Sequence, residues 1–122
     1  MSIVLWVVQT ILALAFVFAG ASKLTQRPEQ LAQRGMAFVE DFTATQVKLI
    51  GTAEVLGAAG LILPWATGIA PVLTPLAAVG LAVLMVGAMV THWRRKEQQV
   101  IGANAILFAA AVFVAIGRFS QL

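Results

Sequence analysis

The side chain best suited to chemistry in this sequence is the carboxyl of Glu54, within the largely apolar stretch 47–63. The only other charged residue of that stretch, Lys48, lies at its edge. A carboxylate near the centre of a bilayer costs roughly 2.5–3.5 kcal/mol on insertion scales, so it normally faces protein or water and has a partner. Glu54 could therefore relay a proton or form a hydrogen bond with a ligand. The alternative is a structural role, in which a protonated or paired carboxyl fixes the register of packed helices.

Three further polar residues could meet Glu54 if the chain crosses a membrane as a helical bundle. A rise of about 1.5 Å per residue places Glu54 on the order of 13 Å, and Asn104 on the order of 8 Å, from the same end of their helices. Lys23 and His92 lie at that same end, and the long stem of Lys23 can reach inward. We expect Glu54, Asn104 and either Lys23 or His92 to form a small polar pocket. Asn104 could instead bond helix to helix, and His92 could be an interfacial residue.

The pairing of Glu54 decides its charge. Alone in an apolar setting, desolvation would favour the neutral acid, whereas a nearby Lys23 would favour the ionised carboxylate. Gln9 lies in the opposite half of the bundle and is expected to be separate from this pocket.

Cysteine is absent, which excludes disulfides, thiolate nucleophiles and Cys-ligated metal or Fe–S centres. His92 is the single histidine, so neither a bis-histidine haem site nor a His-rich metal site can form, and no metal site is expected. We also expect no covalent cofactor. A redox role would depend on a partner's cofactor or on a bound quinone or lipid-like molecule.

The elements that would position these residues are membrane-spanning helices. The chain has 122 residues, of which 61% are hydrophobic and 11% charged, against about 25% charged in soluble domains. Mean hydropathy is +0.95. This composition predicts one integral membrane domain over residues 1–122, and the basic pI near 10.2 is better explained by orientation in the membrane than by nucleic acid.

Four stretches have the length of about 20 apolar residues that a spanning helix needs, and they lack the alternation of barrel strands. They predict an all-α, four-helix membrane bundle with spans at approximately 3–21, 45–63, 71–91 and 99–117. Pro64, Gly68 and Pro71 are assigned to the turn after the second span.

The connecting segments 22–44 and 92–98 carry most of the basic residues. The positive-inside rule places both segments in the cytoplasm and both termini outside. Arg118 is on the terminal side, and each tryptophan falls at a predicted span end, as in an aromatic belt. Cleavage of a signal peptide after Ala19-Gly20-Ala21 is the competing interpretation, but the first residues lack the basic charge it requires.

The longer connection, 22–44, has structure of its own. Pro28 and Glu29 resemble a helix start and Gly35 a helix stop. We expect a short interfacial helix followed by an apolar stretch that lies at the membrane surface or partly caps the bundle. Simple packing at the interface, without a gating role, is the alternative.

Small residues predict where helices approach closely. Ala53 and Gly57 form a small-xxx-small pair, followed by Gly60, while Gly80 and Gly87 are expected to do the same for the third span. Packing through the glycine face of the second span could also produce a homodimer.

Four short motifs resemble the DoxX-like family of small bacterial four-helix membrane proteins. They are Phe18-Ala-Gly-Ala-Ser-Lys23-Leu24, Gly51-Thr-Ala-Glu54-Val-Leu-Gly57, His92-Trp-Arg-Arg95 and Asn104. The resemblance implies a bacterial cell membrane and a polar site of unknown ligand at Lys23, Glu54, His92 and Asn104. It also implies an association with membrane oxidoreductase systems. Some relatives are described as the small subunit of a thiosulfate:quinone oxidoreductase, and others are linked to superoxide dismutase and a sulfurtransferase.

Three functions remain open at this point. The first is a non-enzymatic membrane subunit that binds a quinone or lipid, or anchors a redox-enzyme partner. Such a site needs an apolar slot and one or two hydrogen-bond donors. The second is an isomerase-like enzyme in which Glu54 moves a proton on a lipophilic substrate. The third is an oligomeric or transport element, although the opposite half offers few polar groups for a pathway, mainly Gln9, Thr67 and Thr74.

Overall fold

The computed structural model describes residues 2–33 and 35–122, and within them all regular structure is helical. The elements are α1 (Ser2–Thr25), α2 (Pro28–Gln33), the 3₁₀ helix η1 (Ala37–Asp41), α3 (Ala44–Thr67), α4 (Leu73–Arg94) and α5 (Gln98–Ser120). In the described ranges, α1, α3, α4 and α5 are long and apolar enough to cross a membrane. The predicted all-α fold, with a short helix between the first two spans, is confirmed.

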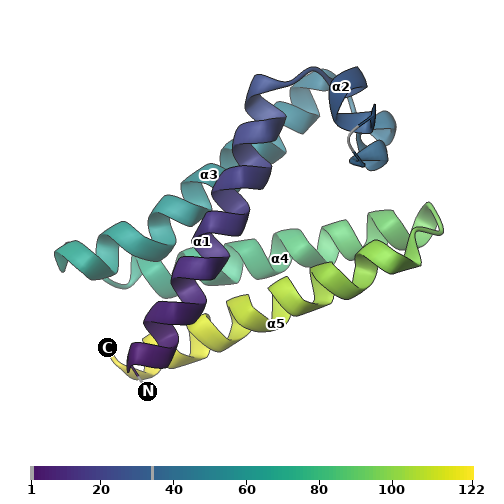
Figure 1. Ribbon diagram of the computed structural model, residues 1–122. Coiled ribbons are helices and arrows are strands. Elements are labelled where there is room, and N and C mark those ends of the chain that lie inside the picture. The colour runs from purple at the N-terminus through teal and green to yellow at the C-terminus, as the bar shows by residue number, and fades with distance from the viewer. Residues whose placement is uncertain (1, 34) are drawn as a thin grey trace.

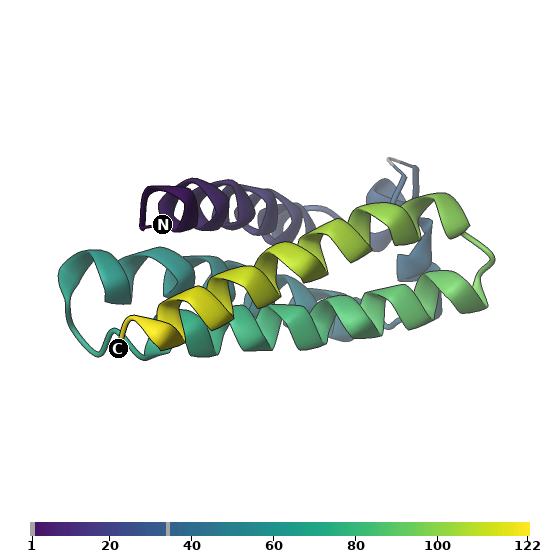
Figure 2. The ribbon, with the colours of Figure 1, turned by 90° about the horizontal axis from the view of Figure 1, so that it is seen from below.

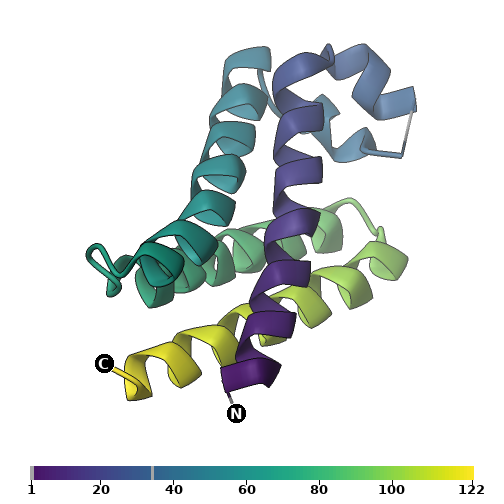
Figure 3. The same cartoon turned by 60° about the vertical axis from the view of Figure 1, so that its left-hand side comes forward.

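The four long helices form two antiparallel pairs, α1 with α3 and α4 with α5 (Figure 1). The pairs cross at a wide angle and separate toward one end, so that the molecule resembles a V (Figures 1 and 3). Both termini and the α3–α4 turn lie at the closed end (Figure 2). We call this the terminal end. The other, which contains segments 22–44 and 92–98, we call the basic end.

A hydrophobic core joins the two pairs over the middle of the bundle. Leu12 and Phe16 of α1, Leu61 of α3, Leu81 of α4 and Val114 of α5 are essentially inaccessible to solvent. Many other apolar side chains point outward, among them Ile11, Leu14, Leu56, Val83 and Ile106. An apolar exterior around an apolar core is what a bundle surrounded by lipid requires.

The first pair is held together by a close contact between two glycines. A Cβ built on Gly20 would lie 2.6 Å from the carbonyl oxygen of Gly51, and one on Gly51 would lie 2.9 Å from the carbonyl oxygen of Gly20. Any larger residue would push α1 and α3 apart. Gly57 and Gly60 face α4 in the same manner, against Leu81 and Ala77 respectively.

The predicted packing roles of Ala53, Gly80 and Gly87 are wrong within this chain. Ala53 is exposed, and no described atom lies within 4 Å of a Cβ built on Gly80 or Gly87. The physical reason is helix periodicity: Gly80 and Gly87, seven residues apart, share one face of α4, whereas Leu81, which packs on Gly57 of α3, lies on another. Gly80 and Gly87 instead line the space between the pairs.

The predicted and observed helix ends differ most at the end of the second span. Pro64, which was assigned to a turn, lies inside α3. Proline cannot donate a backbone hydrogen bond, so the carbonyl of Gly60 loses its helical partner. The Thr74 hydroxyl of α4 donates to that carbonyl at 2.9 Å, and the Gln9 amide donates to the Leu61 carbonyl at 2.7 Å. These bonds allow α3 to continue to Thr67, and Gly68 then ends it in the left-handed conformation, with φ of 73°.

The segment between α1 and α3 folds over the basic end (Figures 1 and 3). Its helix α2 begins at Pro28, as predicted, and Gly35 follows with φ of 96°. Leu31, Val39 and Val47 form a small apolar cluster that fixes the segment against the start of α3. Thr43 and Gln46 form a capping box on α3. We call residues 35–42 the lid.

Candidate functional site

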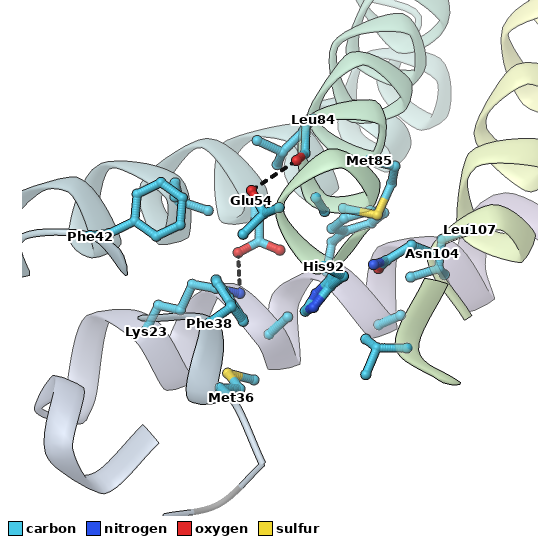
Figure 4. Close-up of a pocket in the computed structure, with 18 of the residues that line it drawn as sticks. Lys23, Met36, Phe38, Phe42, Glu54, Leu84, Met85, His92, Asn104 and Leu107 are labelled. Carbon is cyan, nitrogen blue, oxygen red and sulfur yellow. Dashed lines mark hydrogen bonds and ion pairs between the residues drawn. The ribbon is translucent and has the colours of Figure 1, made fainter. Parts of the chain in front are cut away.

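A cavity of about 580 Å³ lies between the separated helix pairs at the basic end. Lys23, Glu54, His92 and Asn104, the four residues singled out in the sequence, all line it (Figure 4). The lid supplies one wall through Gly35, Met36, Phe38 and Phe42. Most of the lining is apolar, so the expected small polar pocket is instead a larger apolar chamber that contains a few polar groups.

Lys23 and Glu54 form an ion pair on the α1–α3 wall. The Lys23 Nζ lies 2.7 Å from the Glu54 Oε1, and the two side chains are 5% and 4% exposed. The glycine contact positions both stems, because a Cβ on Gly20 would lie 3.1 Å from the Glu54 Cβ and one on Gly51 would lie 2.8 Å from the Lys23 Cβ. Helical side chains lean toward the N-terminus of their helix, which directs the Lys23 stem toward the depth of Glu54.

Asn104 faces the cavity from α5, on the opposite wall. It is 8% exposed, and its amide nitrogen Nδ2 has no hydrogen-bond partner among the described residues. The alternative role of Asn104, as a bond between helices, would require such a partner. A buried donor without a partner costs about 1–3 kcal/mol, so this amide is a candidate to meet a ligand.

His92 lies in the last turn of α4 and is directed by Glu97, a residue that the sequence did not single out. The His92 Nδ1 lies 2.9 Å from the Glu97 Oε1, which the Arg95 Nε also contacts at 3.3 Å. The hydrogen bond with His92 lowers the pKa of the Glu97 carboxyl, and Arg95 acts in the same direction against desolvation. The one local signal for this contact is the spacing of five residues across a turn.

Ionic contacts hold the lid over the cavity. Arg95, between α4 and α5, donates to Glu40 at 3.0 Å and to Asp41 at 2.9 Å, both in η1. The ring of Phe38 packs edge-on against His92, with centroids 5.3 Å apart, and lies 5.7 Å from the Lys23 Nζ. The lid therefore contacts both helix pairs.

A second polar cluster lies at the terminal end and was missed in the sequence. Arg118 is completely buried, donates from Nε to Gln9 at 2.8 Å, and lies between the rings of Trp6 and Trp65, at 5.2 and 4.5 Å from their centroids. Gln9 is thus separate from the cavity, as expected. Trp6 and Trp65 are half-buried and pack on this cation, whereas Trp93 is 67% exposed.

No group of three His, Cys, Asp or Glu side chains with the geometry of a metal site occurs in residues 2–33 and 35–122. The groups available in the cavity are those that bind an organic molecule: one ion pair, one imidazole and one free amide. Their separation onto two walls means that a ligand contacting all of them would bridge the two helix pairs.

Comparison with known proteins supports one assignment. Searches of curated proteins and of solved structures gave no match. A sequence model described as the DoxX-like family matches residues 7–114, a range that includes Lys23, Glu54, His92 and Asn104. Together with four helices able to span a membrane, this match shows that the chain is a multi-pass membrane protein that belongs to the DoxX-like family.

Proposed function

We propose that this protein is a membrane subunit that binds a quinone, or a similarly lipophilic molecule carrying oxygen atoms, in the cavity at the basic end. Small-molecule sites typically measure about 300–1,000 Å³ and combine apolar walls with a few placed polar groups. A cavity of about 580 Å³ with this lining has the size for a substituted ring and part of its tail.

The observation that carries the proposal is the buried, unpartnered amide of Asn104. A quinone carbonyl accepts hydrogen bonds and would satisfy the Nδ2 donor without introducing a charge. On the other wall, the Lys23 ammonium could donate to the second carbonyl while remaining beside Glu54. The two polar positions therefore suit a flat molecule with oxygen atoms at both ends.

The walls of the cavity suit a ligand that arrives from the membrane. Val83 lines the cavity and its side chain is 66% exposed, so the cavity is open beside it. Gly80 and Gly87, one turn before and one turn after Val83, contribute no side chains to this wall. A tail could leave the cavity at this point and lie among acyl chains.

In this proposal the protein holds the molecule and a partner protein performs the electron transfer, because the chain has no cysteine and a single histidine. The membrane is the bacterial cell membrane, with both termini outside. The acid–base alternative would need Glu54 to exchange protons freely, and its carboxylate is engaged by Lys23.

The test is a binding titration with decyl-ubiquinone on protein reconstituted in quinone-free nanodiscs. We expect saturable binding, and we expect Asn104→Leu to weaken it about 10-fold or more, which corresponds to about 1.4 kcal/mol. Leucine keeps the branched shape of the side chain and removes the amide donor together with the amide acceptor.

Gln99→Leu is the matched control, because Gln99 is an exposed amide on the same helix outside the cavity lining. The affinity of Gln99→Leu for decyl-ubiquinone should equal that of the unmodified protein. Absence of saturable binding, or equal affinity in Asn104→Leu, would contradict the proposal.

A further inference from the structure

The contact between His92 and Glu97 indicates which ring nitrogen of His92 carries a proton. Glu97 is tied to His92 twice: its backbone N–H donates to the His92 carbonyl at 2.8 Å, and its carboxylate meets the Nδ1 at 2.9 Å. Lys96, just before it, takes the left-handed conformation with φ of 59°, which closes the turn. The position of the carboxylate is therefore determined by backbone geometry as well as by charge.

A carboxylate only accepts hydrogen bonds, so the Nδ1 of His92 must be the donor. Arg95 beside Glu97 also favours the ionised carboxylate. When the imidazole is neutral, the proton on Nδ1 leaves Nε2 with a free lone pair. The Nε2 has no hydrogen-bond partner among the described residues, and His92 is a buried residue of the cavity lining.

The α4–α5 wall then presents an acceptor, the His92 Nε2, and a donor, the Asn104 Nδ2 (Figure 4). A carbonyl oxygen can satisfy only the donor. A phenolic hydroxyl can satisfy both, since it donates its proton and accepts through its lone pairs. A carbonyl ligand would give the His92 Nε2 no hydrogen-bond donor, which would reduce affinity for the carbonyl form.

We propose that this wall selects a hydroxyl-bearing aromatic ring, such as the reduced, hydroquinone form of a quinone, and that Glu97 is the positioning residue that sets this preference. His92 accepts the ligand's O–H at Nε2, and Asn104 donates to a ligand oxygen from Nδ2. The inference rests on the proposed binding function and names the chemical form that binds more tightly.

The tautomer can be measured without a ligand, because His92 is the only histidine of the chain. The protein is labelled with ¹⁵N-histidine, purified through a tag free of histidine, and studied by NMR over a pH series, so that the tautomer is read from the neutral ring. We expect a protonated Nδ1 and an unprotonated Nε2. In Glu97→Gln the amide can accept from or donate to the ring, so a mixture of tautomers should appear.

The selectivity is measured with two probes of one skeleton, 4-hexylphenol and its methyl ether 4-hexylanisole, with concentrations referred to the lipid phase. The ether keeps the acceptor oxygen and loses the donor. We expect the protein to prefer the phenol by about 10-fold, and Glu97→Gln to reduce this preference to about 2-fold or less. A general structural role of Glu97 would lower both affinities without changing their ratio.

Glu29→Gln is the control, because Glu29 is an exposed glutamate of α2 that lies outside the cavity lining. Its NMR spectrum and its preference for the phenol should be those of the unmodified protein. A proton on Nε2, or equal affinities for the two probes, would overturn the inference while leaving the binding function intact. If neither probe nor decyl-ubiquinone bound, the binding function itself would fail, and the selectivity with it.

Discussion

At the scale of single residues, the Lys23–Glu54 pair shows how a charged group is accommodated inside this bundle. Each ion alone would be costly in an apolar interior, and together they form a contact of 2.7 Å. The pair exists because Gly20 and Gly51 bring α1 and α3 close enough for the two stems to meet. Glu54 is thus both a structural residue and part of the cavity wall.

Removing one member of this pair should destabilise the protein more than removing both. Lys23→Met or Glu54→Leu leaves one uncompensated buried charge, for which we expect a loss of roughly 3–5 kcal/mol or neutralisation of the remaining group. The double variant Lys23→Met/Glu54→Leu removes both charges and should recover most of that loss. Unfolding by denaturing detergent in bicelles gives the comparison.

Lys48→Met is the control for this comparison, because Lys48 is an exposed lysine near the start of the same helix α3. Its effect should be within about 0.5 kcal/mol, as for most surface substitutions. If the losses of the two single variants simply added in the double variant, the pair would not be an energetic unit.

The partners of Lys23 and His92 mark the limit of prediction at this scale. The sequence indicated that either residue could reach Glu54, and both alternatives were physically sound. In the structure Lys23 pairs with Glu54, while His92 pairs with Glu97. Side-chain direction and the glycine contact decide between them, and neither can be obtained from spacing alone.

At the scale of elements, Pro64 explains how a helix continues through a residue that usually ends it. The Gly60 carbonyl is freed by the proline and receives the Thr74 hydroxyl from the next helix. Hydropathy and proline position predicted a turn here, because a proline near the end of an apolar stretch is normally a stop signal. The compensation comes from α4, which is adjacent only in the folded state.

The Thr74 bond should therefore matter only while Pro64 is present. Thr74→Val leaves a buried carbonyl unpaired and should cost about 1–3 kcal/mol of stability. In a Pro64→Ala background the backbone N–H of residue 64 can bond to Gly60, and Thr74→Val should then cost less than about 1 kcal/mol. The four variants form a double-mutant cycle that is measured by unfolding in bicelles. If Thr74→Val lowered the free energy of unfolding equally in both backgrounds, the Thr74 bond would not compensate for the proline.

The connection that contains the lid, residues 22–44, was predicted in part from the sequence. The start of α2 and the break at Gly35 follow from the local preferences of proline and glycine. Whether the segment lies on the membrane or caps the bundle depends on Arg95 and its contacts with Glu40 and Asp41, more than 50 residues earlier in the chain. Such a long-range ion pair leaves no local pattern, so the capping arrangement became visible only in the fold.

In the molecule as a whole, most of the basic residues lie at the end where the V opens. The helix pairs are joined at the terminal end by the buried Arg118 cluster and separate at the basic end, where the lid and the cavity lie. A ligand in the cavity would therefore be held at the membrane side that carries most of the basic residues.

The orientation of the molecule in the membrane can be tested directly because the chain contains no cysteine. We expect Gln98→Cys, at the basic end, to react with a membrane-impermeant maleimide only after cells are opened, and Ser120→Cys, at the terminal end, to react in intact cells. Both residues are exposed. The reverse labelling pattern would show that the positive-inside rule assigns the wrong orientation to this protein.

The class of the protein follows from local composition: the apolar stretches, their lengths and the two basic segments are enough to predict four spanning helices. Lys23, Glu54, His92 and Asn104, which share the cavity, could also be identified from the sequence, because a polar group in or beside an apolar span stands out whichever way it points. The separation of the helix pairs, the exposure of Gly80 and Gly87 to a cavity, and the contact of Glu97 with His92 became visible only in the folded chain. These features depend on contacts between residues on different helices or across turns, and the crossing angle that creates them is a property of the packed bundle.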